Sequence, residues 1–152
     1  HIDKTFNLTV KSFVLGVQRA ARLMSAAGGG SIVAVSGMDT LKAVPRHGLL
    51  GAAKAALETL VLYWAHELAG RGIRVNAVNP GFFDTESTRR YLGPAFEKIH
   101  AALIATTPAR RAPDPGEIAR VIRFLALGDA TWICGQTIVV DGGQNQSLGA
   151  NF

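Results

Sequence analysis

Three short apolar runs, set between segments with helical spacing, limit what this chain can fold into. The runs cover residues 31–36, 73–79 and 136–141 and are rich in β-branched side chains. The run at 31–36 is continuously apolar between its two serines, as is typical of a strand buried on both faces of a parallel sheet, and the runs at 73–79 and 136–141 are expected to be further strands. Helices between such strands form right-handed crossovers. The sequence therefore predicts an α/β fold, with three parallel strands covered by flanking helices.

Four segments have the spacing of amphipathic helices. They cover residues 3–26, residues 46–69, about 91–104, and a stretch from Asp114 to near Gly128. The last of these has a defined start, because Asp114 can cap the helix, Pro115 suits its first position and Glu117 completes a capping box. The first helix should stop at the run of three glycines that ends at Gly30.

Composition and charge exclude several classes of protein. The 152 residues carry a net charge of +5, but the arginines are scattered in pairs, so we expect no nucleic-acid partner. No apolar run approaches the ~20 residues needed to span a bilayer, so we expect no membrane segment. Cys134 is the single cysteine, which excludes an internal disulfide and a cysteine-based metal site. No signal segment is evident, and a cytoplasmic location is expected.

The arrangement of the glycines bears on how much of a domain is present. In a doubly wound fold, the adenine side of a dinucleotide is held by a strand, a glycine-rich turn and a helix. Here the three glycines precede a strand, so they do not form that turn. The chain begins at His1 and its first methionine is Met24. We therefore expect residues 1–152 to form the carboxy-terminal part of one Rossmann-like domain, whose amino-terminal strands are missing and whose strand 31–36 has an uncovered edge.

Four motifs, in order, resemble the short-chain dehydrogenase/reductase family. They are Gly-Gly-Ser-Ile-Val-Ala-Val-Ser at 29–36, Lys-Ala-Ala-Leu-Glu from Lys54, Gly-Ile-Arg-Val-Asn-Ala-Val-Asn-Pro-Gly at 72–81, and Val-Asp-Gly-Gly at 140–143. The likeness covers nearly the whole chain and corresponds to the carboxy-terminal half of the family. Within it, the opening helix, the Lys54 helix and the terminal motif look most like the short-chain-type enoyl-acyl-carrier-protein reductases.

The resemblance implies a function and its partners. Members transfer a hydride between a nicotinamide cofactor, NADP or NAD, and a small substrate, here an enoyl or keto thioester. An acyl carrier protein is a possible partner. The helices at 3–26 and 46–69 match those through which members of the family associate, so we expect a homo-oligomer.

The resemblance places Lys54 at the position of the family lysine, which binds the nicotinamide ribose and lowers the pKa of a catalytic tyrosine. That tyrosine is missing, because Leu50 stands four residues before Lys54 and His47 stands seven before it. If the helix extends back to His47, a seven-residue step returns to within ~20° of the same face. Histidine is a competent general acid, so His47 is the candidate proton donor. The alternative for His47 is an exposed loop histidine.

Two further catalytic positions also depart from the family pattern. The substrate-orienting serine falls on Gly37, and the neighbouring Ser36 should face the other way on a strand. The helix asparagine falls on Thr9, and Asn7 should lie on the opposite side of the helix. Tyr63 is placed on the face away from Lys54, whereas Tyr91 could approach a substrate.

The cofactor side of the site keeps the family pattern. Residues 80–85 match the Pro-Gly-x3-Thr loop that follows a parallel strand. Pro80 and Gly81 would let the backbone approach the nicotinamide, and the Thr85 hydroxyl could bind its carboxamide or a phosphate. An ordinary Pro-Gly turn is the alternative.

The segment after this loop resembles the mobile substrate lid of the family. Its apolar side chains could contact an acyl chain or could equally form core: Tyr91, Phe96, Ile99, Leu103 and Ile104. Arg89 and Arg90 could contact an acidic carrier protein, or could be an ordinary surface pair.

Two functions follow from these motifs. The first is an NAD(P)H-dependent reductase of which this chain alone is inactive, with Lys54 on the ribose, Thr85 on the carboxamide and His47 or a water as proton donor. The second is a catalytically degenerate relative that acts as a dimerisation or scaffold partner, because the tyrosine, serine and asparagine positions are all changed.

Overall fold

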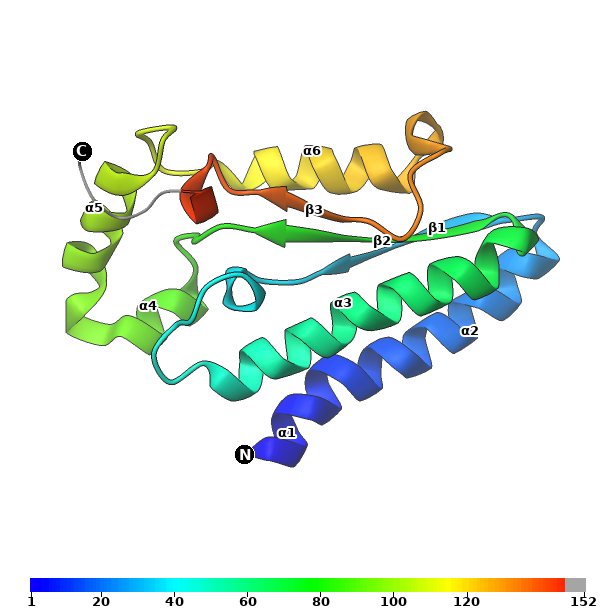
Figure 1. Ribbon diagram of the computed structural model, residues 1–152, viewed down its shortest axis with the longest axis horizontal. Helices are drawn as coiled ribbons and strands as arrows, with labels where there is room; N and C mark the ends of the chain where they lie inside the picture. Colours follow the sequence, from blue (N-terminus) through cyan, green and yellow to red (C-terminus); the bar gives the residue numbers. More distant parts are fainter. Residues whose placement is uncertain (147–152) are drawn as a thin grey trace.

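The structure, a computed structural model, describes residues 1–146 and has three parallel strands between two layers of helices (Figure 1). The strands are β1 (Gly30–Val35), β2 (Ile73–Pro80) and β3 (Thr137–Val140). The helices are α1 (Ile2–Phe6), α2 (Ser12–Ala26), α3 (Gly48–Leu68), α4 (Glu86–Leu92), α5 (Phe96–Thr106) and α6 (Pro115–Ala126). The α/β class and the three-stranded parallel sheet that the sequence predicts are both confirmed.

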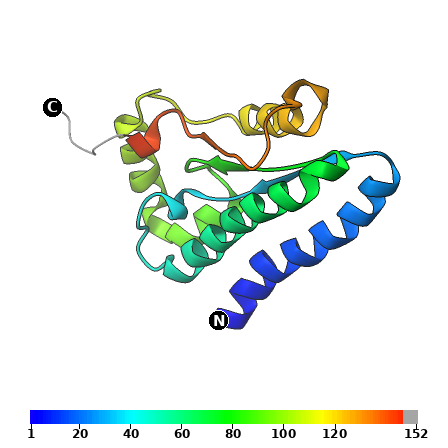
Figure 2. The ribbon, with the colours of Figure 1, turned by 45° about the vertical axis from the view of Figure 1, so that its right-hand side comes forward.

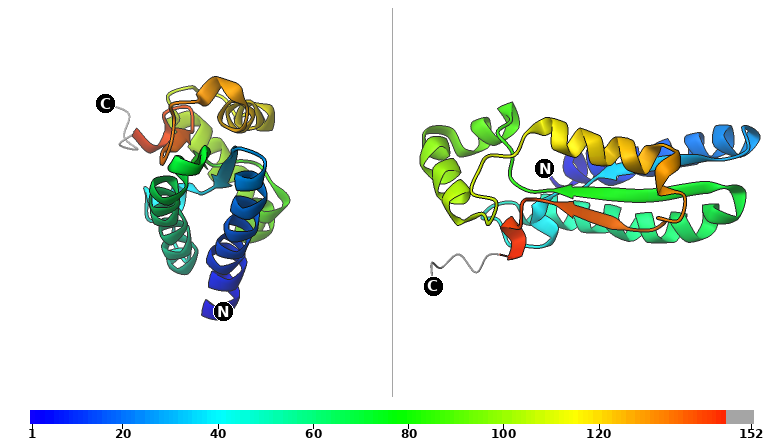
Figure 3. Two further views of the ribbon diagram at one scale, coloured as in Figure 1. Left: turned by 90° about the vertical axis from the view of Figure 1, so that its right-hand side faces the viewer. Right: turned by 90° about the horizontal axis from the view of Figure 1, so that it is seen from above.

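The helices divide between the two faces of the sheet. Helices α2 and α3 cover one face and α6 covers the other, as the end-on view shows (Figure 3, left). The larger core lies under α2 and α3 and consists of Val17, Ala21, Ala34, Leu57, Val61, Ala65, Leu68, Ile73, Val75 and Ala77. The smaller core lies under α6, around Val78, Leu125 and Ala130. Burial on both faces favours apolar side chains along the strands, and the two asparagines buried in β2, Asn76 and Asn79, are hydrogen-bonded.

The predicted helices occur, with several differences in their bounds. The first runs from Ile2 to Ala26 beside α3 (Figure 2), but contains a π-helical turn over Asn7–Lys11. The second begins at Gly48 and ends at Leu68, inside the predicted 46–69. The irregular helical region predicted at about 91–104 consists of two helices: α4 and α5 are separated by a short turn at Gly93–Ala95, because Gly93 has φ +53° and Pro94 cannot continue the α4 hydrogen bonds.

The start of α6 follows the sequence prediction. An oxygen of Asp114 accepts from the backbone N–H of Gly116 at 3.0 Å, and Glu117 accepts from the N–H of Asp114 at 3.0 Å. Pro115 occupies the first position of the helix. This capping box sets the direction in which α6 crosses the sheet.

The sheet order is β1-β2-β3, so β2 is central and β1 lies at an edge. Within residues 1–146, no strand pairs with the outer edge of β1. Helices α4 and α5 lie beyond the carboxyl ends of the strands (Figure 1), where ligands of open parallel sheets bind. Among the described residues, no helix has both the length and the apolar character that a membrane crossing requires.

Candidate functional site

A cavity of about 860 Å³ opens at the carboxyl ends of β1 and β2. Its walls come from the loop after β1, the first turns of α3, the loop after β2, and helices α4, α5 and α6. They are mainly apolar and include Met38, Val44, Leu50, Phe82, Phe83, Leu92, Ile99, Leu103, Ile118 and Ile122. All five residues that the sequence nominates for the site, His47, Lys54, Pro80, Gly81 and Thr85, line this one cavity.

Lys54 lies on α3 at the border between this cavity and a groove along β1. Its Nζ donates to the carbonyl of Val35, the last residue of β1, at 2.7 Å. Burial lowers the pKa of the Lys54 ammonium, and the nearby carboxylates of Asp39 and Glu58 partly oppose that shift. An ammonium has three donors, so the single bond to Val35 leaves donors that can reach a ligand.

The lowered pKa of Lys54 predicts how stability depends on pH. Between the folded-state pKa and the ordinary value of 10.5, the unfolded chain binds more protons than the folded chain. The free energy of unfolding of the wild type should therefore rise, relative to that of Lys54→Met, as the pH increases from neutral toward 10.5. Urea unfolding at a series of pH values measures this difference, and a pH-independent difference would contradict it.

His47 immediately precedes α3, with φ −96° and ψ 4°. Because α3 begins at Gly48, it does not extend back to His47. The prediction that His47 shares a helical face with Lys54 is therefore wrong. The side chain nevertheless faces the cavity and is 23% exposed, so it is not an exposed loop histidine. Its Nδ1 lies 3.0 Å from Oδ2 of Asp39, and its ring lies 4.2 Å from the ring of Tyr91.

The family's serine and asparagine positions hold Gly37 and Thr9. Ser36 borders the cavity but is largely buried, and its hydroxyl donates to Glu58. Thr9 lines the groove beside β1, whereas Asn7 is exposed.

A carboxylate that the sequence interpretation missed organises the end of the sheet. Oε1 of Glu58 accepts from Ser36, from the hydroxyl of Thr40 at 3.0 Å and from the amide of Asn79 at 3.0 Å. Glu58 lies four residues after Lys54, on the same face of α3, and this spacing was the available signal. Asp39, in the polar loop just after β1, was missed as well.

The loop after β2 packs against the residues that follow β3. A Cβ on Gly81 would lie 2.8 Å from Cβ of Asp141 and 2.9 Å from Oε1 of Gln144, so a side chain does not fit there. The N–H of Phe82 donates to Gln144 at 2.8 Å. Thr85 caps α4 by accepting from the N–H of Thr88 at 3.1 Å. Glycine at position 81 is therefore required by the packing of the loop itself.

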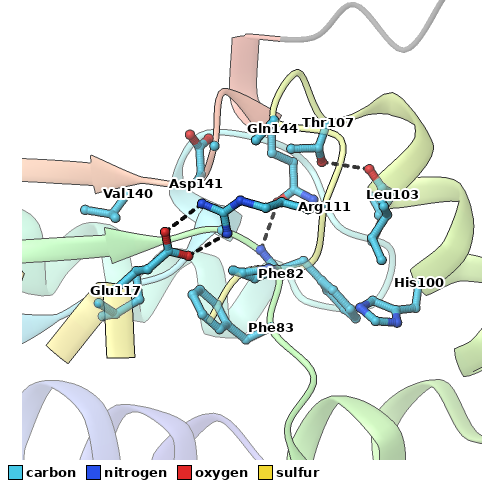
Figure 4. Close-up of a pocket in the computed structure, with 16 residues that line it drawn as sticks. Phe82, Phe83, His100, Leu103, Thr107, Arg111, Glu117, Val140, Asp141 and Gln144 are labelled. Carbon is cyan, nitrogen blue, oxygen red and sulfur yellow. Dashed lines mark hydrogen bonds and ion pairs between the residues drawn. The ribbon is translucent and has the colours of Figure 1, made fainter. Parts of the chain in front are cut away.

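A second cavity, of about 120 Å³, lies behind this loop (Figure 4). Arg111 closes one side of it through two bonds to Glu117, at 2.6 and 2.8 Å. These bonds, together with the N–H of Asp114, lower the pKa of Glu117 to about 2. This small cavity separates the loop from α5 and α6.

The predicted lid divides into two parts. Tyr91, Ile99 and Leu103 face the larger cavity, while Phe96 is buried against the rings of Phe82 and His100. The hydroxyl of Tyr91 donates to the carbonyl of Pro45, which ties α4 to the loop before α3.

The two arginines of this region are paired within the chain. Arg89 contacts Asp84 at 2.5 Å and Glu97 at 3.1 Å, and Arg90 contacts Glu86 at 2.6 Å. The local charge that could attract an acidic partner is therefore largely neutralised.

Comparisons with known proteins agree on one family. Residues 1–145 match the family model described as enoyl-(acyl carrier protein) reductase. The chain is 41% identical to 1-cyclohexenylcarbonyl-CoA reductase of Streptomyces collinus, over 94% of this chain and 50% of that protein. It is 36% identical to the 3-oxoacyl-[acyl-carrier-protein] reductase of Thermotoga maritima, over 93% of this chain and 56% of that protein.

Solved structures give the same result. A short-chain type dehydrogenase/reductase from Mycobacterium ulcerans superimposes with a TM-score of 0.88 at 30% identity, covering 99% of this chain and 54% of that one. A gluconate 5-dehydrogenase from Burkholderia cenocepacia, solved with NADP and tartrate, superimposes with a TM-score of 0.83 at 30% identity, covering 92% and 54%. The chain spans about half the length of these relatives.

Proposed function

Because the chain belongs to the short-chain dehydrogenase/reductase family, we propose that it forms the nicotinamide and substrate side of an NAD(P)H-dependent reductase of enoyl or keto thioesters. The observation that carries this proposal is the mainly apolar cavity with Lys54 and His47 on one wall. Apolar walls favour an acyl group over a polyol, because a buried hydroxyl without a partner costs free energy. The names of two relatives specify thioesters, one of coenzyme A and one of acyl carrier protein.

The residues present fit the nicotinamide end of NADP or NAD. The cavity lies at the carboxyl ends of parallel strands, and Lys54, whose Nζ donates to the carbonyl of Val35, lines it. Lys54 would hold the ribose, Pro80 and Gly81 would border the ring, and the Thr85 hydroxyl would bind the carboxamide. When bound, the reduced cofactor supplies the hydride.

The chain's own residues supply the proton and the environment. His47 faces the cavity and, as an imidazolium, can donate a proton to the carbon or oxygen of the substrate. The apolar side chains of α4 and α5 exclude water from the reacting atoms. Tyr91 covers the outer face of the imidazole and keeps it against this wall.

The proposal is tested by joining this chain to the amino-terminal half of the S. collinus reductase, a protein referred to below as the completed reductase. Crotonyl-CoA and acetoacetyl-CoA are assayed with NADPH and gluconate is assayed with NADP⁺, each by the change in NADPH absorbance. We expect kcat/KM for a thioester to exceed that for gluconate by at least about 100-fold, because the cavity leaves polyol hydroxyls unpaired. Equal activity on gluconate would exclude the proposed substrate class.

The 152-residue chain alone is proposed to be inactive. A groove along β1, lined by Leu8, Phe13, Ile32 and Lys54, borders the strand edge that has no partner among the described residues. Nothing in the described residues resembles the glycine-rich turn that holds the adenine side of a dinucleotide. We expect no saturable NADPH binding by this chain in the micromolar range, measured by cofactor fluorescence. Micromolar saturation would contradict this expectation.

A second candidate function, a dimerisation or scaffold partner, is favoured by the outer face of the first helix. Leu8, Leu15 and Leu23 recur at seven- and eight-residue spacing there and are 55 to 68% exposed. Exposed apolar stripes of this kind commonly mark association surfaces.

Substitution of this stripe tests association directly. The double variant Leu15→Lys/Leu23→Lys is expected to be monomeric by light scattering, whereas the wild type forms an oligomer, because buried ammonium groups oppose the interface. Leu127→Lys, at another exposed leucine outside these helices, is the control and should remain oligomeric. An unchanged mass for the double variant would place the interface elsewhere.

A further inference from the structure

Two departures of this chain from the family pattern, Gly37 at the serine position and His47 in place of the tyrosine, lie near each other around the turn that follows β1. We infer that Asp39 is the positioning residue for His47: its carboxylate accepts the Nδ1–H of the imidazole and so presents Nε2 to the cavity. The catalytic meaning of this pair rests on the proposed function. The geometry of the pair can be tested without any activity.

Backbone hydrogen bonds fix both of the segments that carry Asp39 and His47. Asp39 lies on the short helix Met38–Thr40, whose ends are fixed by the bonds from Thr40 N–H to Gly37 and from Leu41 N–H to Met38. His47 donates its own N–H to Val44 and accepts from Gly51. Nδ1 and Oδ2 are 3.0 Å apart, and the side chains of Asp39 and His47 are 11% and 23% exposed. A hydrogen bond this well shielded is weakly screened by solvent.

Two glycines provide the space that Asp39 occupies. A Cβ at Gly37 would lie 3.0 Å from Oδ1 of Asp39, and a Cβ at Gly51 would lie 2.9 Å from its carbonyl oxygen. A side chain at position 37 would therefore crowd the carboxylate of Asp39 unless one of the two shifts by a few tenths of an ångström. Glycine at position 37 leaves room for the Asp39 carboxylate beside His47.

The other charged and titratable groups around His47 make other contacts and do not accept the Nδ1–H of its imidazole. Glu58 already accepts three hydrogen bonds, and Lys54 donates to Val35. Tyr91 contacts the imidazole with its ring, and the guanidinium of Arg46 lies 5.3 Å from the Tyr91 ring centroid on the outer side. The oxygen Oδ2 of Asp39 is thus the acceptor that the structure gives to Nδ1.

This arrangement has a definite consequence for proton transfer. The proton leaves Nε2 of the imidazolium as a new C–H or O–H bond forms on the substrate. The imidazole that remains is neutral and keeps its Nδ1–H on Asp39. It regains a proton at Nε2 from solvent after the product leaves, so the carboxylate stays ionised throughout.

The tautomer is measured in the 152-residue chain with ¹⁵N-labelled histidine, by long-range proton–nitrogen NMR at about pH 8.5, where an ordinary imidazole is neutral. His47 is assigned with His47→Gln, and the three other histidines serve as internal references. We expect Nδ1 of His47 to carry the proton in the wild type. That signature should be lost in Asp39→Ala and retained in Glu58→Gln, which removes the other nearby carboxylate.

The outcomes separate the inference from the proposed function. An Nε2–H tautomer in the wild type, or a tautomer unchanged in a folded Asp39→Ala chain, would overturn the inference. In the completed reductase, Asp39→Ala should lower kcat by about 10- to 100-fold with little change in the KM for NADPH, as for other groups that orient a catalytic partner. If the tautomer is as expected but His47→Ala is fully active, the positioning by Asp39 is supported and only the proposed proton donor fails.

Discussion

Replacing His47 with alanine is expected to lower kcat of the completed reductase by about 10² to 10⁴-fold, the range typical of a positioned general acid. His47 lies on the cavity wall and carries an imidazole, a side chain that can act as a general acid, and its Nδ1 lies 3.0 Å from Oδ2 of Asp39. The KM for NADPH should change little, because Lys54 and the loop after β2 are left intact. Stopped-flow measurement of NADPH consumption separates the chemical step from product release.

His66→Ala is the matched control for this experiment. His66 lies on α3, the helix that His47 precedes, but is exposed and outside the cavity, so its replacement should leave kcat unchanged. His47→Gln keeps a polar side chain of similar size without a titratable nitrogen and should be as slow as His47→Ala. A His47→Ala enzyme with nearly full activity would transfer the role of proton donor to Tyr91 or to a water.

The elements that could be predicted from the sequence are those indicated by the pattern of neighbouring residues. The strand 73–79 and the helix start at Asp114 correspond closely to β2 and to the cap of α6, because burial pattern and capping are properties of neighbouring residues. Apolar spacing continues across Gly93 and Pro94, so the spacing predicts a helical region there without placing the break. A φ of +53° at Gly93 interrupts the helix even though the pattern persists.

Site residues could be predicted only where the family resemblance assigns a role to a residue of a motif. Lys54, Gly81 and Thr85 follow from the resemblance, and the structure brings them to one cavity. Glu58 ends the Lys-Ala-Ala-Leu-Glu motif, but its contacts, like those of Asp39, could not be predicted. The partner of Asp39 lies 8 residues away and those of Glu58 lie 18 to 22 residues away, and they meet only once β1, β2 and α3 are packed. The imidazole of His47 also reaches the cavity by a different route from the one predicted, through the turn before α3 instead of its helical face.

The largest loss of stability is expected from Gly29→Ala, at the end of β1 opposite the site. A Cβ there would lie 2.6 Å from the carbonyl oxygen of Gly72, and the residue has φ +137°, a conformation that is essentially restricted to glycine. The same oxygen accepts the N–H of Gly30, the first bond between β1 and β2. We expect the free energy of unfolding to fall by about 3 kcal/mol or more, measured by urea titration.

The adjacent glycine provides the control that isolates the close contact. Gly28 also has a positive φ, +85°, but an added Cβ would meet nothing within 4 Å. Gly28→Ala should therefore cost only the backbone penalty of about 1 to 2 kcal/mol. The register of β1 places the carbonyl of Val35 against Lys54, and Asp39 beside His47. Equal losses in the two variants would show that β1 can move away from Gly72 at no cost. In that case contacts at the carboxyl end of β1, near the site, would have to fix this register.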